Sequence, residues 1–360
     1  MRSIFLIFIL LIFFGCKDEY KRSSNITQVE IEDILTDSTF SIRALDFNDE
    51  YIFYGSSDHF GMKALQSAFK IDLTEVVISD QKVHNKYQIN NDSLYLHFRA
   101  IEEVNGNLFA LSTGNPARLY KLYRKARKPK LVYEEVNEKV FYDSMVFWNE
   151  NEGIAIGDPT EDCMSIIITR DSGESWSKIS CSDLPPALDG EAAFAASDTN
   201  ITIVGDHTWV ATGGKSSRVL YSPDKGVAWQ VFETPIIQGK STTGMYSIDF
   251  YDENKGFAIG GDYTNPNDTI ANKIRSTDGG KSWQVVADGE GPGYRSCVQY
   301  VPNSNGKELV AIGFKGIDYS NDAGDSWTHL SDKGFYTVRF LNDSIAYAAG
   351  RGRISKLTFR

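Results

Sequence analysis

The stretch Ser276-Thr277-Asp278-Gly279-Gly280-Lys281-Ser282-Trp283 decides the fold, because the chain contains four segments with this spacing. Each has a hydroxyl residue first, an Asp at the third position, a Gly at the fifth and a Trp at the eighth. The other three segments are Thr169–Trp176, Ser222–Trp229 and Ser320–Trp327. Recurrence at such a period indicates a repeat architecture. We call the four segments the Asp-Trp turns.

The Asp-Trp turns have the composition of tight hairpin turns. The hydroxyl and the Asp can accept hydrogen bonds from backbone N–H groups, the Gly can adopt a positive φ, and the Trp can cover the turn. The segments resemble the Asp-box (BNR) repeat of sialidase-like β-propellers, which implies an all-β fold. We therefore expect structural roles for Asp171, Trp176, Asp224, Trp229, Asp278, Trp283, Asp322 and Trp327.

Seven blocks of short apolar strands predict a seven-bladed β-propeller with Asp-box hairpins. In the first block the strands are Ser41–Phe47, Tyr51–Gly55 and Ala64–Ile71, and in the fourth they are Ala192–Ala196, Ile201–Gly205 and Arg218–Ser222. The last block ends after three strands. Thr27–Ile34 alternates apolar and polar residues, so we expect this N-terminal strand to close the ring and remove its exposed edges. A six-bladed ring would require the first two blocks to merge.

The N-terminus has the pattern of an export signal. Arg2 precedes the apolar run 4–14, which suits the core of a signal peptide and is too short to span a bilayer. Gly15-Cys16 resembles the bacterial lipobox, which implies a lipoprotein signal peptide at residues 1–15 and a lipid on Cys16. An ordinary cleaved signal that contains a Cys is the alternative.

Residues 16–25 are expected to be the lipidated Cys and a polar tether, and residues 26–360 the propeller. Lys17-Asp18-Glu19 resembles the signal that sends lipoproteins of the Bacteroidetes to the outer face of the outer membrane. It implies an outer-membrane lipoprotein at the cell surface rather than on the periplasmic face. A plain solvated tether is the alternative.

The chain is acidic, with 48 Asp and Glu against 37 Lys and Arg and a net charge of −11. This balance argues against nucleic acid or anionic lipid as the main partner. The five His are scattered, and no Cys/His spacing suggests zinc, so we expect neither a metal nor a cofactor. No Gly-x-Gly-x-x-Gly stands between a strand and a helix, which argues against a nucleotide-dependent oxidoreductase.

Cys163 and Cys181 lie almost symmetrically about the turn that contains Asp171 and Trp176. We expect them to face each other across two strands. An exported protein meets an oxidising compartment, which favours a disulfide. Two buried free thiols are the alternative, because the hairpin register can spoil the geometry. Cys297 lies in an expected first strand and is expected in the core.

Candidate functional residues are expected where each first strand begins and just after the Gly that ends each second strand, since these positions surround one end of a propeller axis. The strand starts supply Arg43, Arg99, Asp143, Glu191, Tyr246, Arg295 and Tyr336, and the second-strand ends supply Asp158, Asp206 and Asp262. Guanidinium groups bind carboxylates bidentately, so these residues predict a pocket for an anionic or polyhydroxylated ligand.

Three interpretations of this set stay open. Sialidases use an Arg triad for the substrate carboxylate, a Tyr–Glu nucleophile pair and an Asp acid. That resemblance implies a triad of Arg43, Arg99 and Arg295, with Glu191, Tyr246, Tyr336 and Asp143 as catalytic candidates, although the Phe/Tyr-Arg-Ile-Pro motif is missing. Ligand binding without turnover and structural ion pairing between blades are the alternatives.

The second strands Gly153–Gly157 and Gly256–Gly260 and the turn Asp278–Trp283 resemble more closely the photosystem II assembly and stability factors and their bacterial relatives. Those proteins are seven-bladed binding scaffolds with an Arg-rich patch on one face, and the resemblance covers nearly the whole mature chain. It implies an exported lipoprotein whose propeller binds a protein or glycan partner. A sialidase-like glycoside hydrolase is the alternative.

Overall fold

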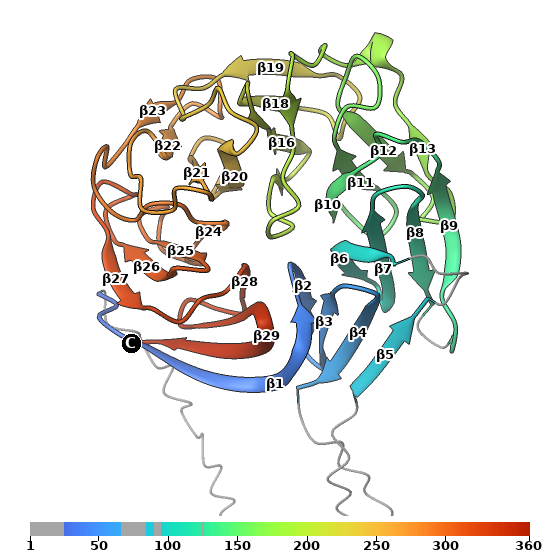
Figure 1. Cartoon of the computed structure of the whole chain (residues 1–360), viewed down its shortest axis with the longest axis horizontal. Helices are drawn as coiled ribbons and strands as arrows, with labels where there is room; N and C mark the ends of the chain where they lie inside the picture. The colour runs from blue at the N-terminus through green and yellow to red at the C-terminus, as the bar shows by residue number, and fades with distance from the viewer. Residues whose placement is uncertain (1–24, 66–83, 90–94, 124–125) are drawn as a thin grey trace, which may run out of the picture.

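The computed structural model describes residues 25–65, 84–89, 95–123 and 126–360 of the chain. Seven antiparallel sheets surround a central axis in chain order, as Figure 1 shows from one end. The prediction of an all-β, seven-bladed propeller is confirmed, and the six-bladed alternative is wrong. Each blade places its first strand at the axis and its last strand at the rim.

The blades consist of the following strands, from the axis outward. Blade one has β2 (Ala44–Phe47), β3 (Tyr51–Gly55), β4 (His59–Ala64) and β5 (His84–Gln88); blade two has β6 (His97–Val104), β7 (Asn107–Thr113), β8 (Ala117–Leu122) and β9 (Lys130–Glu135); blade three has β10 (Tyr142–Phe147), β11 (Gly153–Gly157), β12 (Ser165–Thr169) and β13 (Ser177–Lys178); blade four has β15 (Ile201–Val204), β16 (His207–Ala211), β18 (Arg218–Ser222) and β19 (Gln230–Glu233). Blade five has β20 (Thr243–Phe250), β21 (Gly256–Asp262), β22 (Lys273–Ser276) and β23 (Gln284–Val285); blade six has β24 (Cys297–Tyr300), β25 (Leu309–Gly313), β26 (Gly316–Ser320) and β27 (Thr328–Ser331); blade seven has β28 (Thr337–Phe340), β29 (Ile345–Phe359) and β1 (Val29–Ser41).

The N-terminal strand closes the ring, as predicted. β1 pairs antiparallel with the end of β29, with Val29 opposite Phe359. β29 folds back at Gly352, whose φ is 78°, and the Phe359 N–H donates to the Ser344 carbonyl at 2.8 Å. β29 therefore supplies two antiparallel segments, and blade seven has four in all. β1, from the start of the chain, is the outermost. Val29 and Ile31 pack against the core between blades six and seven.

Two blades are divided differently from the sequence prediction. In blade one the third strand is β4, which ends at Ala64, whereas we expected it to begin there; the part of Ala64–Ile71 beyond residue 65 lies outside the described residues. In blade four the first strand is β15, so Ala192–Ala196 is not a blade strand. β15 and β16 form a hairpin about Gly205, at φ 60°. A loop was expected after Gly205, but as the one that follows a second strand. The assignment of Ala192–Ala196 to a first strand therefore shifted the expected strand order of this blade by one.

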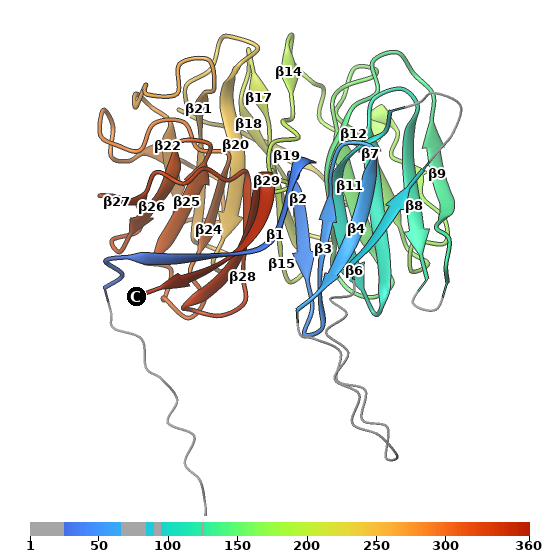
Figure 2. The ribbon, with the colours of Figure 1, turned by 60° about the horizontal axis from the view of Figure 1, so that its bottom comes forward.

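Blade five carries an extension toward one face of the ring. β20 pairs with β17 (Gly213–Gly214), which pairs with β14 (Glu191–Ala192). Gly213 is needed in this extension, because a Cβ at its position would collide with the ring of Phe194. In the side view of Figure 2, β14 and β17 lie at the upper edge of the ring.

The four Asp-Trp turns share one hydrogen-bond pattern. The hydroxyl of the first residue accepts from the N–H of the fifth-position Gly at 2.7–2.9 Å. The Asp Oδ1 accepts from the N–H of the residue before the Trp at 2.8–3.0 Å. Three of the four Trp also donate through Nε1 to the carbonyl of that Gly. The Asp and the hydroxyl thus satisfy the backbone of a turn whose central residues have positive φ.

The same turns join each of blades three to six to the blade before it. In every turn the carbonyl of the residue after the Asp accepts a hydrogen bond from a side chain of the preceding blade, at 2.6–3.1 Å. The pairs are Lys121 with Ser172, Arg170 with Lys225, Trp209 with Gly279, and Arg275 with Ala323. We call this side of the ring the Asp-Trp face and the other side, where β14 and β17 rise, the axial face.

Cys163 and Cys181 form a disulfide, with their Cα atoms 5.4 Å apart. Cys181 begins the short 3-10 helix η1 (Cys181–Asp183), so the bond anchors the start of the long connection from blade three to blade four. Cys297 is buried as a free thiol in the core. The described part of the chain contains no helix that is long and apolar enough to cross a membrane.

Candidate functional site

The connection from blade three to blade four runs into the centre of the ring. Residues 193–200 have no regular secondary structure, yet all but Phe194 are buried. Ala193, Ala195, Ala196 and Ser197 are small, which lets the backbone enter the narrow space between the seven first strands. We call residues 193–200 the axial segment.

The axial segment is hydrogen-bonded to each of the other six blades. Its partners are Arg43 of blade one, Arg99 and Ile101 of blade two, Ser144, Met145 and Asp158 of blade three, Ser247 and Ile248 of blade five, Ser296 of blade six, and Thr337 and Arg339 of blade seven. A buried irregular segment needs such partners for its backbone polar groups. The axial segment therefore ties the inner strands together near the axial face.

Arg43 and Arg99 lie together over the axial segment and bind its backbone carbonyls. Arg43 Nη1 donates to the Ala196 carbonyl at 3.4 Å, and Arg99 Nη1 donates to the Ala195 carbonyl at 2.9 Å. Neither guanidinium forms an ion pair with a carboxylate of the described residues, and Arg43 Nε is buried without a partner among them. Burial and the neighbouring Arg43 lower the pKa of Arg99 to about 10. Two like charges are thus held close without a counter-ion.

Arg295 does not join this pair. Its Nε donates to Asp318 Oδ2 at 2.6 Å and its Nη1 to the Tyr294 carbonyl at 2.8 Å. Both members of the Arg295–Asp318 ion pair are buried. The structure therefore brings two of the three expected arginines together, and it gives the third the ion-pairing role that was the structural alternative.

Asp143 and Asp158 belong to blade three, and Asp143 lies near Arg99. Asp143 is fully buried, and neither of its carboxylate oxygens has a hydrogen-bond partner among the described residues. Burial, followed by the nearby Asp158, raises the pKa of Asp143 well above its usual range, although Arg99 acts against this shift. Asp158 accepts from the Ala193 N–H at 2.7 Å, and burial raises its pKa to about 6. Asp143 therefore does not form a hydrogen-bonded ion pair with Arg99.

Glu191 and Tyr246 occupy separate places. Glu191 lies in β14 and binds Arg218 through both carboxylate oxygens, at 2.6 and 3.1 Å. Tyr246 is buried and donates its hydroxyl proton to the Thr242 carbonyl at 2.9 Å. The expected start of a blade strand at Glu191 is wrong, because blade four begins at β15. These two residues therefore do not form the Tyr–Glu pair that the sialidase resemblance implied.

A cluster of aromatic rings lies beside the two arginines on the axial face. The Arg43 guanidinium lies over the Tyr336 ring, 4.0 Å from its centroid. Phe194 and Tyr246 stack with centroids 4.0 Å apart, and Tyr294 meets Tyr246 edge to face at 4.8 Å. The aromatic–arginine face is the set Arg43, Arg99, Phe194, Tyr246, Tyr263, Tyr294, Phe314 and Tyr336.

Two aromatic rings of this face reach solvent. Tyr263 is 48% exposed and Phe314 is 42% exposed, and both contact Tyr294, which is almost fully buried. The buried Tyr294 and the two exposed rings thus form a continuous apolar surface. Such surfaces are typical of binding sites because large rings bury area at low entropic cost.

Asp262 and Asp206 lie on opposite faces. Asp262 is buried at the end of β21 beside the aromatic–arginine face, where it accepts from the Thr264 N–H and hydroxyl and lies 3.7 Å from Lys240 Nζ. Asp206 was expected beside it, and this placement is wrong. Since blade four begins at β15, Asp206 lies in the turn from β15 to β16 on the Asp-Trp face.

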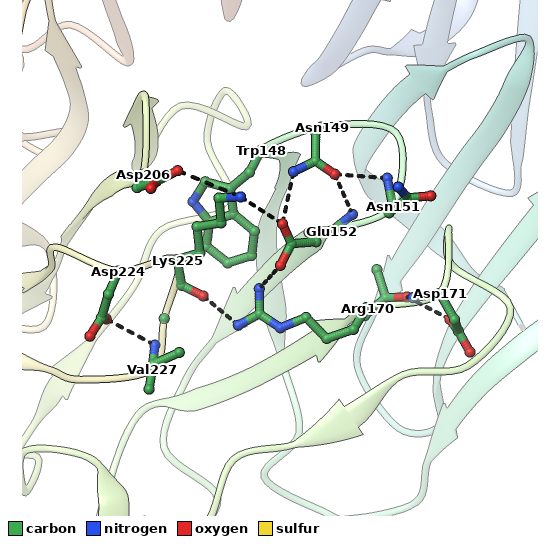
Figure 3. Close-up of polar contacts among 12 residues, drawn as sticks. Trp148, Asn149, Asn151, Glu152, Arg170, Asp171, Asp206, Asp224, Lys225 and Val227 are labelled. Atoms are coloured by element: carbon green, nitrogen blue, oxygen red, sulfur yellow. Dashed lines mark hydrogen bonds and ion pairs between the residues drawn. The ribbon is translucent and has the colours of Figure 1, made fainter.

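Figure 3 shows the surroundings of Asp206, which form part of a network between blades three and four. Glu152 accepts from Arg170 and from Lys225, each at 2.7 Å, and Lys225 lies 3.5 Å from the exposed Asp206. These cations are paired with carboxylates or with a turn carbonyl. The network is a structural link of the Asp-Trp face and does not belong to the axial face.

Deeper in the ring, the guanidinium of Arg339 lies near four carboxylates. Asp46, Glu102, Asp198 and Asp249 come from four different blades or their lead-in segments, and Arg339 lowers the pKa of each. Burial prevails over this effect and raises the pKa of Asp46 and Asp249 to about 6 and that of Asp198 to about 8. No group of three or more His, Cys, Asp or Glu in the described residues is placed to hold a metal ion.

A separate hollow of about 860 Å³ lies between blades one and two on the Asp-Trp side, lined by residues such as Tyr51, Phe53 and Leu122. At the junctions that follow, an Asp-Trp turn packs on the preceding blade; the Gly173 turn, for example, packs on Phe109. Blade two has no such turn. The hollow therefore marks a missing repeat and is remote from the candidate residues.

Sequence reasoning missed the axial segment, Phe194 and Phe314. The assignment of Ala192–Ala196 to a strand hid the axial segment, whose signal is a run of small residues too polar at Ser197-Asp198-Thr199-Asn200 for a core strand. Phe314 directly follows the Gly that ends a second strand, as Asp158 does. The rule that selected Asp158 would have selected Phe314 if it had not been limited to polar side chains.

No family model matches the sequence, and no curated protein matches it. Solved structures do resemble the fold. The structure described as "YCF48 bound to D1 peptide" superposes with a TM-score of 0.62 at 11% identity, over 93% of this chain and 96% of that one. The RRP9 WD40 repeats give a TM-score of 0.61 at 12% identity, over 92% and 98%. The WD40 β-propeller domain of Doa1 gives 0.56 at 10% identity, over 92% and 97%. Identities this low show the fold alone.

Proposed function

We propose that this propeller binds an extended segment of a protein partner across its aromatic–arginine face. The observation that carries the proposal is the pair Arg43 and Arg99, two close guanidinium groups without a carboxylate counter-ion among the described residues. A carboxylate from a ligand would supply the missing charge through charge-assisted hydrogen bonds. Tyr263 and Phe314 would supply the apolar contact.

Two further points support a peptide ligand. The structurally similar YCF48 is described as bound to a peptide. The four Asp-Trp turns have the spacing of Asp-box repeats, and we assign the chain to the Asp-box propellers related to photosystem II assembly factors on that resemblance. The sialidase-like alternative has less support, because Glu191 is bound to Arg218 and Tyr246 to the Thr242 carbonyl.

The test is selection of random 12-residue peptides by the purified propeller, followed by titration of the enriched peptides against variants. Arg43→Met and Arg99→Met should each weaken binding at least tenfold, and added salt should weaken it further. Arg170→Met on the Asp-Trp face is the matched control and should leave binding unchanged. Enriched peptides that bind all three variants equally would contradict the proposal. A parallel glycan array that showed the only specific binding would establish the glycan alternative.

We further propose that residues 1–15 are a lipoprotein signal peptide and that a lipid on Cys16 anchors the protein at the cell surface. Both segments lie outside the described residues. Cys16→Ser should move the full chain from the detergent phase to the aqueous phase in a partitioning experiment while its thermal melt stays the same. Protease digestion of intact cells should remove the anchored protein. Detergent partitioning that survives Cys16→Ser would contradict the anchor, and resistance to protease in intact cells would place the protein on the periplasmic face.

A further inference from the structure

The described chain enters the propeller on the Asp-Trp face. The side-chain oxygen of Asn25 accepts from Asn321 Nδ2 at 3.1 Å, and Asn321 lies in the Asp-Trp turn of blade six. Ile26 is buried in the core with Tyr319, and the Thr27 N–H donates to the Arg360 carbonyl at 2.8 Å. Figure 2 shows β1 beginning low on the ring, near the C-terminus, and rising toward the side of β14.

The chain between Cys16 and this entry point is short. Residues 17–25 number nine, so even a fully extended chain would span only about 30 Å. The eight residues of β20 alone rise about 26 Å from one side of the ring to the other, and loops add to this height. A path to the axial face would also have to pass around the rim of a blade. The tether of nine residues is therefore too short for the axial face to touch the membrane that holds Cys16.

We infer that the aromatic–arginine face points away from the membrane that carries the protein and that the Asp-Trp face lies next to that membrane. This inference rests on the proposed lipid at Cys16. It deepens the proposed function by naming the kind of partner: a protein segment that approaches from the side opposite to the anchoring membrane. A segment that emerges beside the anchor in the same leaflet would meet the Asp-Trp face instead.

The charges of the Asp-Trp face agree with an orientation set by the tether. The cations in Figure 3 are already bound, Arg170 to Glu152 and to the Lys225 carbonyl, and Lys225 to Glu152. The whole chain carries a net charge of −11. Neither feature attracts anionic headgroups, so this face would stand near the bilayer without binding it.

The test compares two fluorescent labels on the full, lipidated chain in phosphatidylcholine vesicles with a headgroup-linked energy acceptor. Val227→Cys places a label on the Asp-Trp face, where Val227 is 71% exposed, and Leu188→Cys places one on the axial face, where Leu188 is 43% exposed. The native cysteines of the described residues are a disulfide and a buried thiol, so they leave these sites free for labelling.

Energy transfer should be at least threefold more efficient from the label at position 227 than from the label at 188. Inserting 20 Gly/Ser residues between Ser24 and Asn25 should shrink this difference, because the longer tether reaches around the ring. Equal transfer from both labels on the native tether, or greater transfer from 188, would overturn the inference. Vesicle flotation separates the two proposals: a wild-type chain that does not float, or a Cys16→Ser chain that floats as well, refutes the anchor itself and the orientation with it.

Discussion

Arg43 and Arg295 hold corresponding positions before the first strands of blades one and six, yet they meet different surroundings. Arg295 is 5% exposed and shares a buried ion pair with Asp318. Arg43 is half-buried, stacks on Tyr336 and binds one backbone carbonyl. A buried charge that loses its partner is costly, whereas an uncompensated charge near solvent is not. The two residues should therefore respond in opposite ways to the same substitution.

Arg295→Met should lower the free energy of unfolding by about 3–5 kcal/mol, because Asp318 then keeps only His329 as a side-chain partner among the described residues. Arg43→Met should lower it by less than about 1 kcal/mol while weakening peptide binding. Urea denaturation of both variants and titration of the enriched peptides provide the two measurements. Equal losses of stability would show that Arg43 is a structural residue like Arg295.

A substitution of Asp278 tests whether the Asp of an Asp-Trp turn contributes to stability. Its Oδ1 accepts from the Ser282 N–H at 3.0 Å and from the Ser276 hydroxyl at 2.9 Å. Asp278→Ala should lower the free energy of unfolding by about 1–2 kcal/mol through the lost turn bonds. Lys281→Ala is the control in the same turn, because Lys281 is exposed, and it should change stability by less than about 0.5 kcal/mol. Equal melting temperatures for both variants would mean that the turn does not depend on its Asp.

At the scale of elements, the strands were predictable wherever an element repeats. The hydroxyl–Asp–Gly–Trp spacing located four turns, and the closing strand followed from the alternation in Thr27–Ile34. The path of the axial segment was not predictable beyond its small and polar composition, because the segment occurs once and its bonds join residues far apart in sequence, such as Arg339 and Asp198. The candidate site was partly wrong for a related reason. The start of the axial segment had been assigned to the first strand of blade four, so Asp206 and Glu191 lie away from their expected places.

The buried pair Glu191–Arg218 holds β14 and the entry to the axial segment. Glu191 also accepts from the Thr212 hydroxyl at 2.7 Å and from the Leu188 N–H at 2.9 Å. Glu191→Leu should cost about 3–5 kcal/mol of stability by leaving Arg218 unpaired. The double variant Glu191→Leu/Arg218→Met should cost less than the sum of the single variants by about 2 kcal/mol. Additive losses in urea denaturation would mean that the two side chains do not stabilise each other.

For the whole molecule, the carboxylates around the axis make stability depend on pH. Burial raises the pKa of Asp46, Asp158 and Asp249 to about 6, and that of Asp198 to about 8. A group with a raised folded-state pKa binds its proton more tightly in the folded protein, so its contribution is complete below the unfolded pKa near 4 and is lost as the pH rises through the folded value. The melting temperature should therefore fall steadily between pH 5 and pH 8.

Other titratable groups set the limits of this pH range. His329 lies between Asp318 and Asp332 with a raised pKa, so its contribution is also lost as the pH rises. Glu152 and Glu174 have pKa values lowered to about 2 by hydrogen bonds to Lys225 and Lys121, and their contributions are lost as the pH falls from the unfolded value near 4.5 toward 2. Thermal melts from pH 3 to pH 9 should thus show a maximum near pH 5. A maximum at pH 7 or above would contradict the assignment of protonated acids to the axis.

Glu102 is the residue through which this dependence can be changed. Burial and then the neighbours Asp46 and Asp198 raise its pKa well above the usual range, and Arg339 only partly offsets them. Glu102→Gln keeps the shape and removes a carboxyl whose charged form is unfavourable at the axis. The variant should therefore gain about 1–3 kcal/mol over wild type at pH 8 and little at pH 5. The exposed Glu161→Gln removes the same charge elsewhere and should leave the pH profile unchanged. If both variants follow the wild-type curve, the axial carboxylates do not set the pH dependence, and its source has to be sought in His329 instead.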